Sequence, residues 1–184
     1  MKEKKVLMIH EFKKEMLDLN LEDYILTFDD GLYTQYLFLE ELQQIDTKKI
    51  FFISTDIICP EDEQQIGEFI TCREAHQKYF AENKTAYYMK WSQIKEINED
   101  QNCSIGGHSH FHKNLKDVNG LKELFDYLTH DTERMLKNFK ENSIKIEDFC
   151  FPYNYEAPLY RAILEKNGIQ NFYGKERIAI EDLL

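Results

Sequence analysis

Short apolar runs alternate with amphipathic stretches along the chain, and this alternation predicts its elements. Runs rich in β-branched and aromatic residues predict buried strands at 6–9, 24–28, 49–54, 103–105, 148–151 and 171–173. Apolar residues at helical spacing predict helices at 33–42, 91–97, 121–139 and 158–166, with one or two more in the charged segment 59–88, where His76 would face solvent. Strands that alternate with helices indicate an α/β fold with parallel strands.

Polar residues stand at the carboxyl ends of several predicted strands. His10 follows the first strand, Asp29 and Asp30 follow the second, and His108 comes shortly after the fourth. The carboxyl ends of parallel strands lie on one rim, and in βα barrels the catalytic residues gather there. We therefore expect one site at this rim, which also receives the residues that end the third and fifth strands, Ser54-Thr55-Asp56 and Pro152-Tyr153.

Two glycines precede three histidines, at positions 108, 110 and 112. The glycines favour a strand that ends at Ile105 and then turns. On a helix, His108 and His112 would share a face, and imidazoles at this spacing can chelate a divalent metal such as zinc; on a strand, all three histidines would share a face. We favour the pair His108 and His112, without His110. A histidine-rich surface turn is the alternative.

A third metal ligand is available upstream, where Asp29 and Asp30 follow the strand 24–28 and precede Gly31. Adjacent carboxylates at the end of a strand are costly to hold together unless a cation or a proton relieves them. One of the two could bind the metal while its neighbour serves as a base. For this segment alone, an ordinary Asp-Asp-Gly turn is the alternative.

Length, charge and cysteine spacing narrow the class of protein. The 184 residues suit one domain, 1–184, and the net charge of −11 disfavours nucleic acid more than a neutral or amino sugar. No segment approaches the ~20 apolar residues of a membrane span. The apolar run after the basic start breaks at His10-Glu11, short of a secretory signal. Four cysteines without CxxC spacing predict free thiols, and we expect a cytoplasmic protein.

Three motifs in order resemble those of the polysaccharide deacetylase family, the NodB-homology domain, which is similar to carbohydrate esterase family 4. Residues 27–30, Thr-Phe-Asp-Asp, resemble T-F-D-D, and residues 108–112 resemble H-[S/T]-x-x-H. Residues 149–154, Phe-Cys-Phe-Pro-Tyr-Asn, resemble F-R-P-P-Y-G. The resemblance spans roughly residues 5–180 and implies an irregular, incomplete (β/α) barrel.

The resemblance also implies a chemistry and assigns residues to it. The protein would be a metal-dependent hydrolase that removes an N-acetyl or N-formyl group from an amino sugar or glycan precursor. Asp30, His108 and His112 would hold a divalent cation, Zn2+ in the first place and Co2+, Ni2+ or Mn2+ as alternatives. Asp29 would be the base. The backbone N–H of Tyr153, next to Pro152, would stabilise the oxyanion.

The chain departs from the family pattern at three places. Cys150 stands where the family has an arginine that orients the base, and Arg177 is the candidate for the missing charge. Asn154 replaces a glycine. The chain ends at Leu184 before any L-x-H segment, whose histidine is the usual general acid. We expect His10 to be the acid instead, with a structural role for His10, or return of the proton by Asp29, as alternatives.

Because the histidine that usually acts as general acid is missing, a second function is also consistent with the sequence. The chain could be a metal-containing glycan-binding protein that has lost catalysis. The complete ligand set favours the hydrolase over the binding protein.

Overall fold

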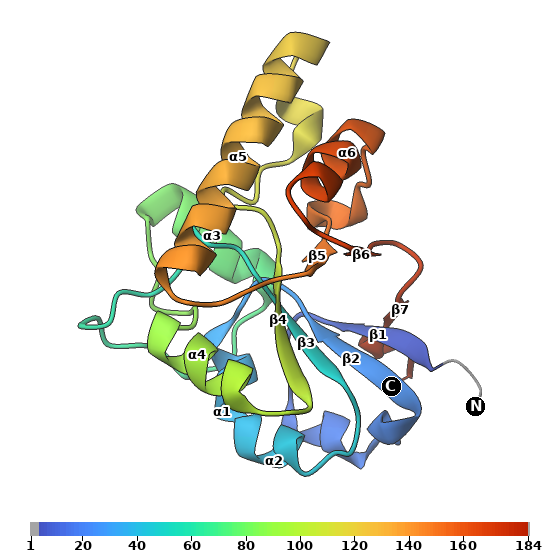
Figure 1. Ribbon diagram of the computed structural model, residues 1–184. Coiled ribbons are helices and arrows are strands. Elements are labelled where there is room, and N and C mark those ends of the chain that lie inside the picture. Colours follow the sequence, from blue (N-terminus) through green and yellow to red (C-terminus); the bar gives the residue numbers. More distant parts are fainter. Residues whose placement is uncertain (1–3, 184) are drawn as a thin grey trace.

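One parallel sheet organises the computed structural model, which describes residues 4–183. Within that range seven strands pair in the order β6-β5-β4-β3-β2-β1-β7, and each pairing is parallel. The sheet curls into a half-barrel with helices around it (Figure 1), so the incomplete (β/α) barrel expected from the sequence is confirmed. The strands are β1 (Lys5–Ile9), β2 (Tyr24–Phe28), β3 (Lys49–Ile53), β4 (Cys103–Gly107), β5 (Asp148–Cys150), β6 (Asn171–Tyr173) and β7 (Ile178–Ala179).

Six α-helices and several short 3-10 turns connect the described strands. The longest helix, α5, packs beside α6 at the β5 side of the sheet (Figure 1). The helices are α1 (Tyr33–Leu37), α2 (Leu39–Gln43), α3 (Cys72–Glu82), α4 (Trp91–Glu99), α5 (Leu121–Glu141) and α6 (Pro158–Lys166). The 3-10 turns are η1 (Lys14–Asp18), η2 (Leu21–Asp23), η3 (Leu115–Asp117), η4 (Pro152–Asn154) and η5 (Ile180–Leu183).

The central strand β3 is buried along its whole length, as parallel sheets covered on both faces require. On one face Phe51 stacks on Phe28, with ring centroids 4.5 Å apart. At the amino end of the strand, the buried ammonium of Lys49 donates to the carbonyls of Ile45 and Thr47. This packing holds β2, β3 and β4 in register, so their carboxyl ends meet at one rim.

The strand β4 continues through Gly106 and Gly107, so the prediction that it ends at Ile105 was wrong. A Cβ atom on Gly106 would lie 2.6 Å from the ring of Phe52, and one on Gly107 would lie 2.6 Å from the sulfur of Met135 in α5. The glycines are needed for these close approaches. They do not mark a turn.

Other boundaries differ for local reasons. The helix predicted at 33–42 is broken at Phe38, which has φ −103° and ψ 15° and packs against Phe12. The strand β7 was not predicted, because two residues carry no periodicity, yet it pairs with β1. The predicted bounds of β2, β6 and α6 match the structure.

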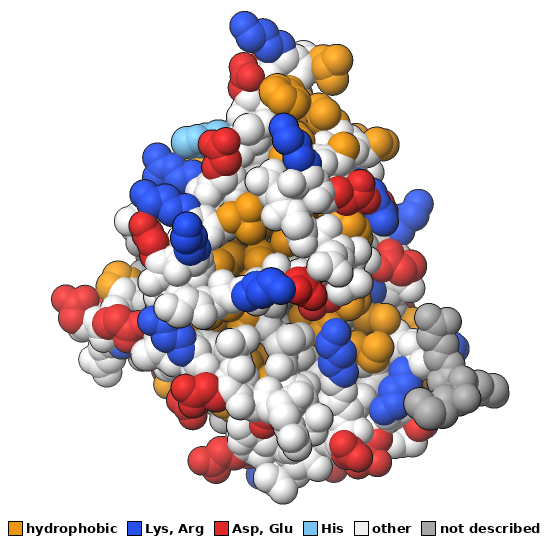
Figure 2. All heavy atoms as spheres, in the orientation of Figure 1, with side chains coloured by type: hydrophobic (Ala, Val, Ile, Leu, Met, Phe, Trp, Pro, Cys, Tyr) orange, Lys and Arg blue, Asp and Glu red, His pale blue; other side chains and the backbone are white. Residues whose placement is uncertain are grey.

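Charged side chains of both signs are interspersed over the face drawn in Figure 2, although the net charge is −11. None of the helices in the described part of the chain has the length and apolar character of a membrane span. All four cysteines are free thiols, as the sequence predicted.

Gly106→Ala should lower the free energy of unfolding by about 1–3 kcal/mol, the usual scale of an overpacked core position. The added methyl would meet the Phe52 ring at 2.6 Å and the Asp148 carbonyl oxygen at 3.0 Å, and the carbonyl belongs to a neighbouring strand. Urea denaturation measures the change, with Ser104→Ala on the same strand as control. A Gly106→Ala protein as stable as the wild type would contradict this packing.

Candidate active site

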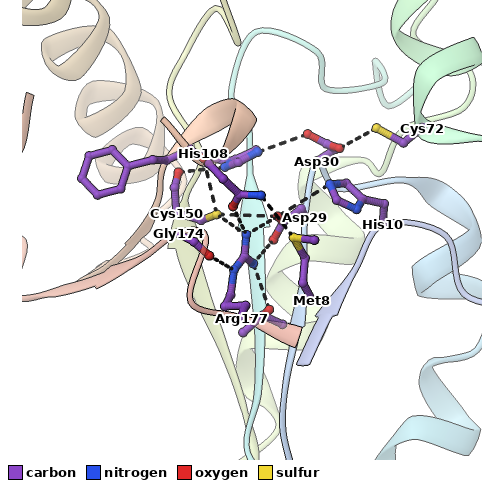
Figure 3. Close-up of polar contacts among 12 residues, drawn as sticks. Met8, His10, Asp29, Asp30, Cys72, His108, Cys150, Gly174 and Arg177 are labelled. Carbon is purple, nitrogen blue, oxygen red and sulfur yellow. Dashed lines mark hydrogen bonds and ion pairs between the residues drawn. The ribbon is translucent and has the colours of Figure 1, made fainter. Parts of the chain in front are cut away.

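Two adjacent aspartates follow β2 and point in different directions. Asp30 and Gly31 both have φ 73°, a left-handed conformation that turns the chain sharply at the end of the strand. As a result Asp29 faces β5 and Arg177, while Asp30 faces the histidines that follow β4 (Figure 3). Both carboxylates are buried. The turn therefore separates two charges that would otherwise repel each other.

Asp30, His108 and His112 converge on one point. The Oδ1 atom of Asp30 lies 3.3 Å from Nε2 of His108 and 3.0 Å from Nε2 of His112. The two imidazole nitrogens lie 3.3 Å apart. The residues predicted as metal ligands are thus brought together, with one potential ligand atom from each.

A turn, not a helix, brings the two histidines together. Ser109 and His112 have φ 67° and φ 50°, and the N–H of His112 donates to the hydroxyl of Ser109 at 2.9 Å. The helical geometry considered for this pair is therefore wrong, although the pair itself is close. His110 points elsewhere: its Nδ1 contacts the Thr55 hydroxyl at 2.8 Å and its Nε2 lies 3.5 Å from Asp56.

The donor set fits a divalent cation. The carbonyl of Cys150 lies 2.8 Å from Nδ1 of His108, which would place the proton on Nδ1 and leave the Nε2 lone pair facing Asp30. Oδ1 of Asp30 is buried and has no hydrogen-bond donor among the described residues. One carboxylate and two imidazoles with open positions is a ligand set that catalytic zinc uses.

When no cation is bound, a proton on His108 can offset part of the negative charge of Asp30. Burial lowers the pKa of His108, but the neighbouring Cys150 and Asp30 outweigh it and raise that pKa well above the usual range. Burial raises the pKa of Asp30, yet the surrounding imidazoles hold it well below its usual range. Metal and proton therefore compete for the same donors, so metal affinity should fall in acid.

Arg177 holds Asp29 in a bidentate ion pair. Nη1 donates to Oδ1 at 2.7 Å and Nη2 donates to Oδ2 at 2.8 Å, and the Arg177 side chain is completely buried. Nη2 also lies 3.0 Å from Sγ of Cys150 and 3.0 Å from the side-chain oxygen of Asn154. Arg177 thus supplies the positive charge that the sequence lacks at position 150, and the small Cys150 leaves space for it.

Asn154 occupies a position that demands an unusual backbone. Tyr153 and Asn154 have φ 57° and φ 53°. Asparagine is one of the few side chains that adopts this left-handed conformation readily, which explains how it can stand where the family has glycine.

A cavity of about 640 Å³ opens above both aspartates. Its lining includes His10, whose side chain is 31 % exposed and whose Nε2 lies 3.8 Å from Oδ2 of Asp29. Tyr153 also lines the cavity, with its ring 5.0 Å from that of His112. Pro152 is buried and lines a smaller neighbouring cavity instead, so its contribution is to shape the loop.

Helix α3 adds two residues that the sequence analysis missed. His76 is not on a solvent-exposed face as predicted: its side chain is 12 % exposed and its ring stacks on His112 at 4.4 Å. Burial lowers the pKa of His76 to about 4. Cys72, four residues earlier, donates its thiol to Oδ2 of Asp30 at 2.8 Å. Their i, i+4 spacing was the available signal.

Comparison with known proteins assigns the class. The family model for polysaccharide deacetylase matches residues 20–172, which is most of the chain. The chain therefore belongs to the polysaccharide deacetylase family. No curated protein matches it.

Solved structures share the fold at low identity. IcaB from Ammonifex degensii is 19% identical, with a TM-score of 0.67 over 96% of this chain and 84% of that one. The BpsB deacetylase domain from Bordetella bronchiseptica is 12% identical, with a TM-score of 0.64 over 96% and 94%. A mutant of BA3943 from Bacillus anthracis, described as a CE4 family pseudoenzyme with restored enzymatic activity, is 17% identical, with a TM-score of 0.53 over 94% and 45%.

Arg177→Met should leave Asp29 as a buried charge without its partner. We expect the free energy of unfolding to fall by about 3–5 kcal/mol at pH 7, the scale seen when one member of a buried pair is removed. Burial raises the pKa of Asp29, but Arg177 outweighs that effect and holds it lowered. The pair therefore stabilises the fold fully at pH values above about 3.9, the pKa of an aspartate in the unfolded chain. This contribution is lost as the pH falls through the lowered pKa of the folded state.

Urea denaturation in metal-free buffer at neutral and acid pH measures this dependence. The exposed Arg161, which pairs with Glu156 and Glu165, provides the control variant Arg161→Met and should change stability little. An Arg177→Met penalty that is equally large in acid would contradict the assignment to the Asp29 charge.

Proposed function

We propose that the protein is a metal-dependent hydrolase that removes an N-acetyl or N-formyl group from an amino sugar or glycan precursor. The observation that carries this proposal is the convergence of Asp30, His108 and His112 beside a carboxylate, Asp29, that Arg177 holds separately. Family membership supports carbohydrate deacetylation in general. The cavity volume of about 640 Å³ lies within the usual range for small-molecule sites.

Asp30, His108 and His112 would hold the cation, with Zn2+ as the first candidate and Co2+, Ni2+ or Mn2+ as alternatives. The cation would lower the pKa of its water and polarise the substrate carbonyl. The Cys150 carbonyl supports this assignment, because it orients the His108 ring toward Asp30.

Asp29 is proposed to accept the proton of the attacking water. Arg177 uses one lone pair of each carboxylate oxygen, and the Cys150 thiol also donates to Oδ2, so Oδ1 keeps a second lone pair for another donor. Because the ion pair lowers the pKa of Asp29 against the effect of burial, the carboxylate is ionised at neutral pH. Asp29 lines the cavity and can therefore reach a water molecule there.

His10 is proposed to deliver a proton to the departing amine. It lies on the same rim, with Nε2 3.8 Å from Asp29, and its partly exposed side chain faces the cavity. The amide nitrogen is a poor leaving group without a proton, and an imidazole can donate one near neutral pH. The alternative is that Asp29 returns the proton that it accepted.

The backbone N–H of Tyr153 is proposed to stabilise the oxyanion. The left-handed conformation at Tyr153, φ 57° and ψ 19°, holds this peptide in a sharp turn at the cavity. Pro152 begins the turn and limits its freedom.

A metal-containing glycan-binding protein without catalysis is the second candidate function. The relative described as a pseudoenzyme supports keeping it, since that protein shares the fold. The cytoplasmic location expected from the sequence stays a prediction. Turnover of acetylated and formylated amino sugars separates the two functions.

His112→Ala should lose the equivalent of metal that is held with Asp30 and His108, whereas His110→Ala should retain it. The reason is that His112 lies 3.0 Å from Asp30, while His110 contacts Thr55 and Asp56. Elemental analysis of the purified, zinc-loaded variants measures the difference. Equal metal loss in both variants would disprove the predicted ligand set.

Asp29→Asn should keep its metal yet lose at least ~10²-fold in turnover, the usual scale of a general base. Asparagine keeps the shape of the side chain but removes the basic carboxylate. Rates on an acetylated amino sugar, corrected for metal content, test the prediction. Turnover equal to that of the wild type would exclude Asp29 as the base.

His10→Gln should depress turnover and remove the alkaline limb of the pH–rate profile, while the equivalent of metal held by Asp30, His108 and His112 stays bound. Glutamine can occupy a similar volume but cannot donate a proton as an acid. A profile identical to that of the wild type would assign proton delivery to Asp29 or another group.

A further inference from the structure

A second group of potential metal ligands lies on the other side of Asp30. While Oδ1 of Asp30 faces His108 and His112, Oδ2 accepts the thiol of Cys72 at 2.8 Å. One donor atom from each of His10, Asp30 and Cys72 lies within 4.8 Å of the other two. Figure 3 shows His108 and Cys72 on opposite sides of the Asp30 carboxylate, with His10 beside it. One carboxylate thus belongs to two donor groups.

We propose that His10, Asp30 and Cys72 form a second cation site, which shares Asp30 with the first and whose occupancy inhibits the enzyme. A tetrahedral zinc ion with bonds of 2.0–2.3 Å needs donors about 3.3–3.8 Å apart. The observed spacing, at most 4.8 Å, requires only a small movement. The half-buried side chain of His10 can make that movement because it is not enclosed.

The chemistry of the surroundings suits a soft divalent cation. A thiolate and an imidazole favour zinc or cobalt over magnesium or calcium. Nδ1 of His76 lies 3.4 Å from Sγ of Cys72, beside the proposed site. On binding, the S–H bond is replaced by a sulfur–metal bond and the proton leaves to solvent through the cavity that Cys72 lines.

The local charge also favours a cation. Asp30 is buried and has imidazoles but, among the described residues, no lysine or arginine beside it, since Arg177 is paired with Asp29. Glu11 adds a second carboxylate, which accepts the backbone N–H of Cys72 at the start of α3. A carboxylate shared by two metal ions is a familiar arrangement in hydrolases whose two metals lie about 3.5–4 Å apart.

Occupancy of this site would affect catalysis through His10. A cation bound to the His10 imidazole takes the lone pair and the proton that the proposed acid needs, and it draws the ring away from Asp29. Excess zinc or cobalt should therefore inhibit, and this consequence rests on the proposed function. The binding itself does not depend on turnover.

Titration of the metal-free protein with Co2+, followed by absorption, tests the site directly. We expect two equivalents to bind, and the intense near-ultraviolet absorption of a cobalt–thiolate bond should appear only with the second. Cys72→Ser should keep the first equivalent and lose the thiolate absorption. The control variant is Cys59→Ser. The Cys59 thiol contacts the Pro60 carbonyl, so this variant should bind cobalt as the wild type does.

Two further variants separate the sites. His112→Ala should lose the first equivalent but keep the thiolate absorption. His10→Gln should weaken the second equivalent at least ~10-fold, since even an outer partner of a ligand contributes that much. A single equivalent in the wild type, thiolate absorption with the first equivalent, or its persistence in Cys72→Ser would overturn the proposal. Because cobalt absorption needs no turnover, a protein without deacetylase activity can still pass or fail this test.

Discussion

The buried ion pair between Asp29 and Arg177 is the interaction on which the site depends. Two charge-assisted hydrogen bonds of 2.7 and 2.8 Å hold the carboxylate in one orientation. The pair links the residue after β2 to the residue before β7, across β1. A short strand of two residues and the turn before it are therefore part of the site. Without Arg177, burial would favour a neutral Asp29 and remove its value as a base.

The same arrangement explains how two adjacent aspartates can have separate roles. The left-handed conformation at Asp30 sends the two carboxylates to different partners, a guanidinium for Asp29 and imidazoles for Asp30. The Cys150 carbonyl orients His108, and the small Cys150 side chain leaves space for Arg177. One residue of β5 thus serves both halves of the site. Cys150 can contact both halves because the parallel sheet brings the ends of β2, β4 and β5 to one rim.

Short-range sequence patterns predicted most strands and several site residues, whereas the other site residues could be found only from the tertiary structure. The apolar runs located the strands, and the polar residues after them located Asp29, Asp30 and His108, because strand ends in a parallel sheet share a rim. The expectation that a pair of glycines ends a strand failed at Gly106 and Gly107, where glycine permits close packing and the strand continues. Cys72 and His76 were also missed: their i, i+4 spacing places them on one helix face, but the charged helix gives no sign that this face covers the site.

An anomalous-scattering map from crystals grown with one equivalent of zinc would show which residues bind the metal. We expect a peak bonded to Asp30, His108 and His112, with Asp29 unbound and still paired with Arg177. The structure also contains a competing donor group, Asp29, His108 and Cys150, whose ligand atoms also lie within 4.8 Å of one another. A peak there, with Arg177 displaced from Asp29, or no peak at His108 and His112, would contradict the proposed ligand set.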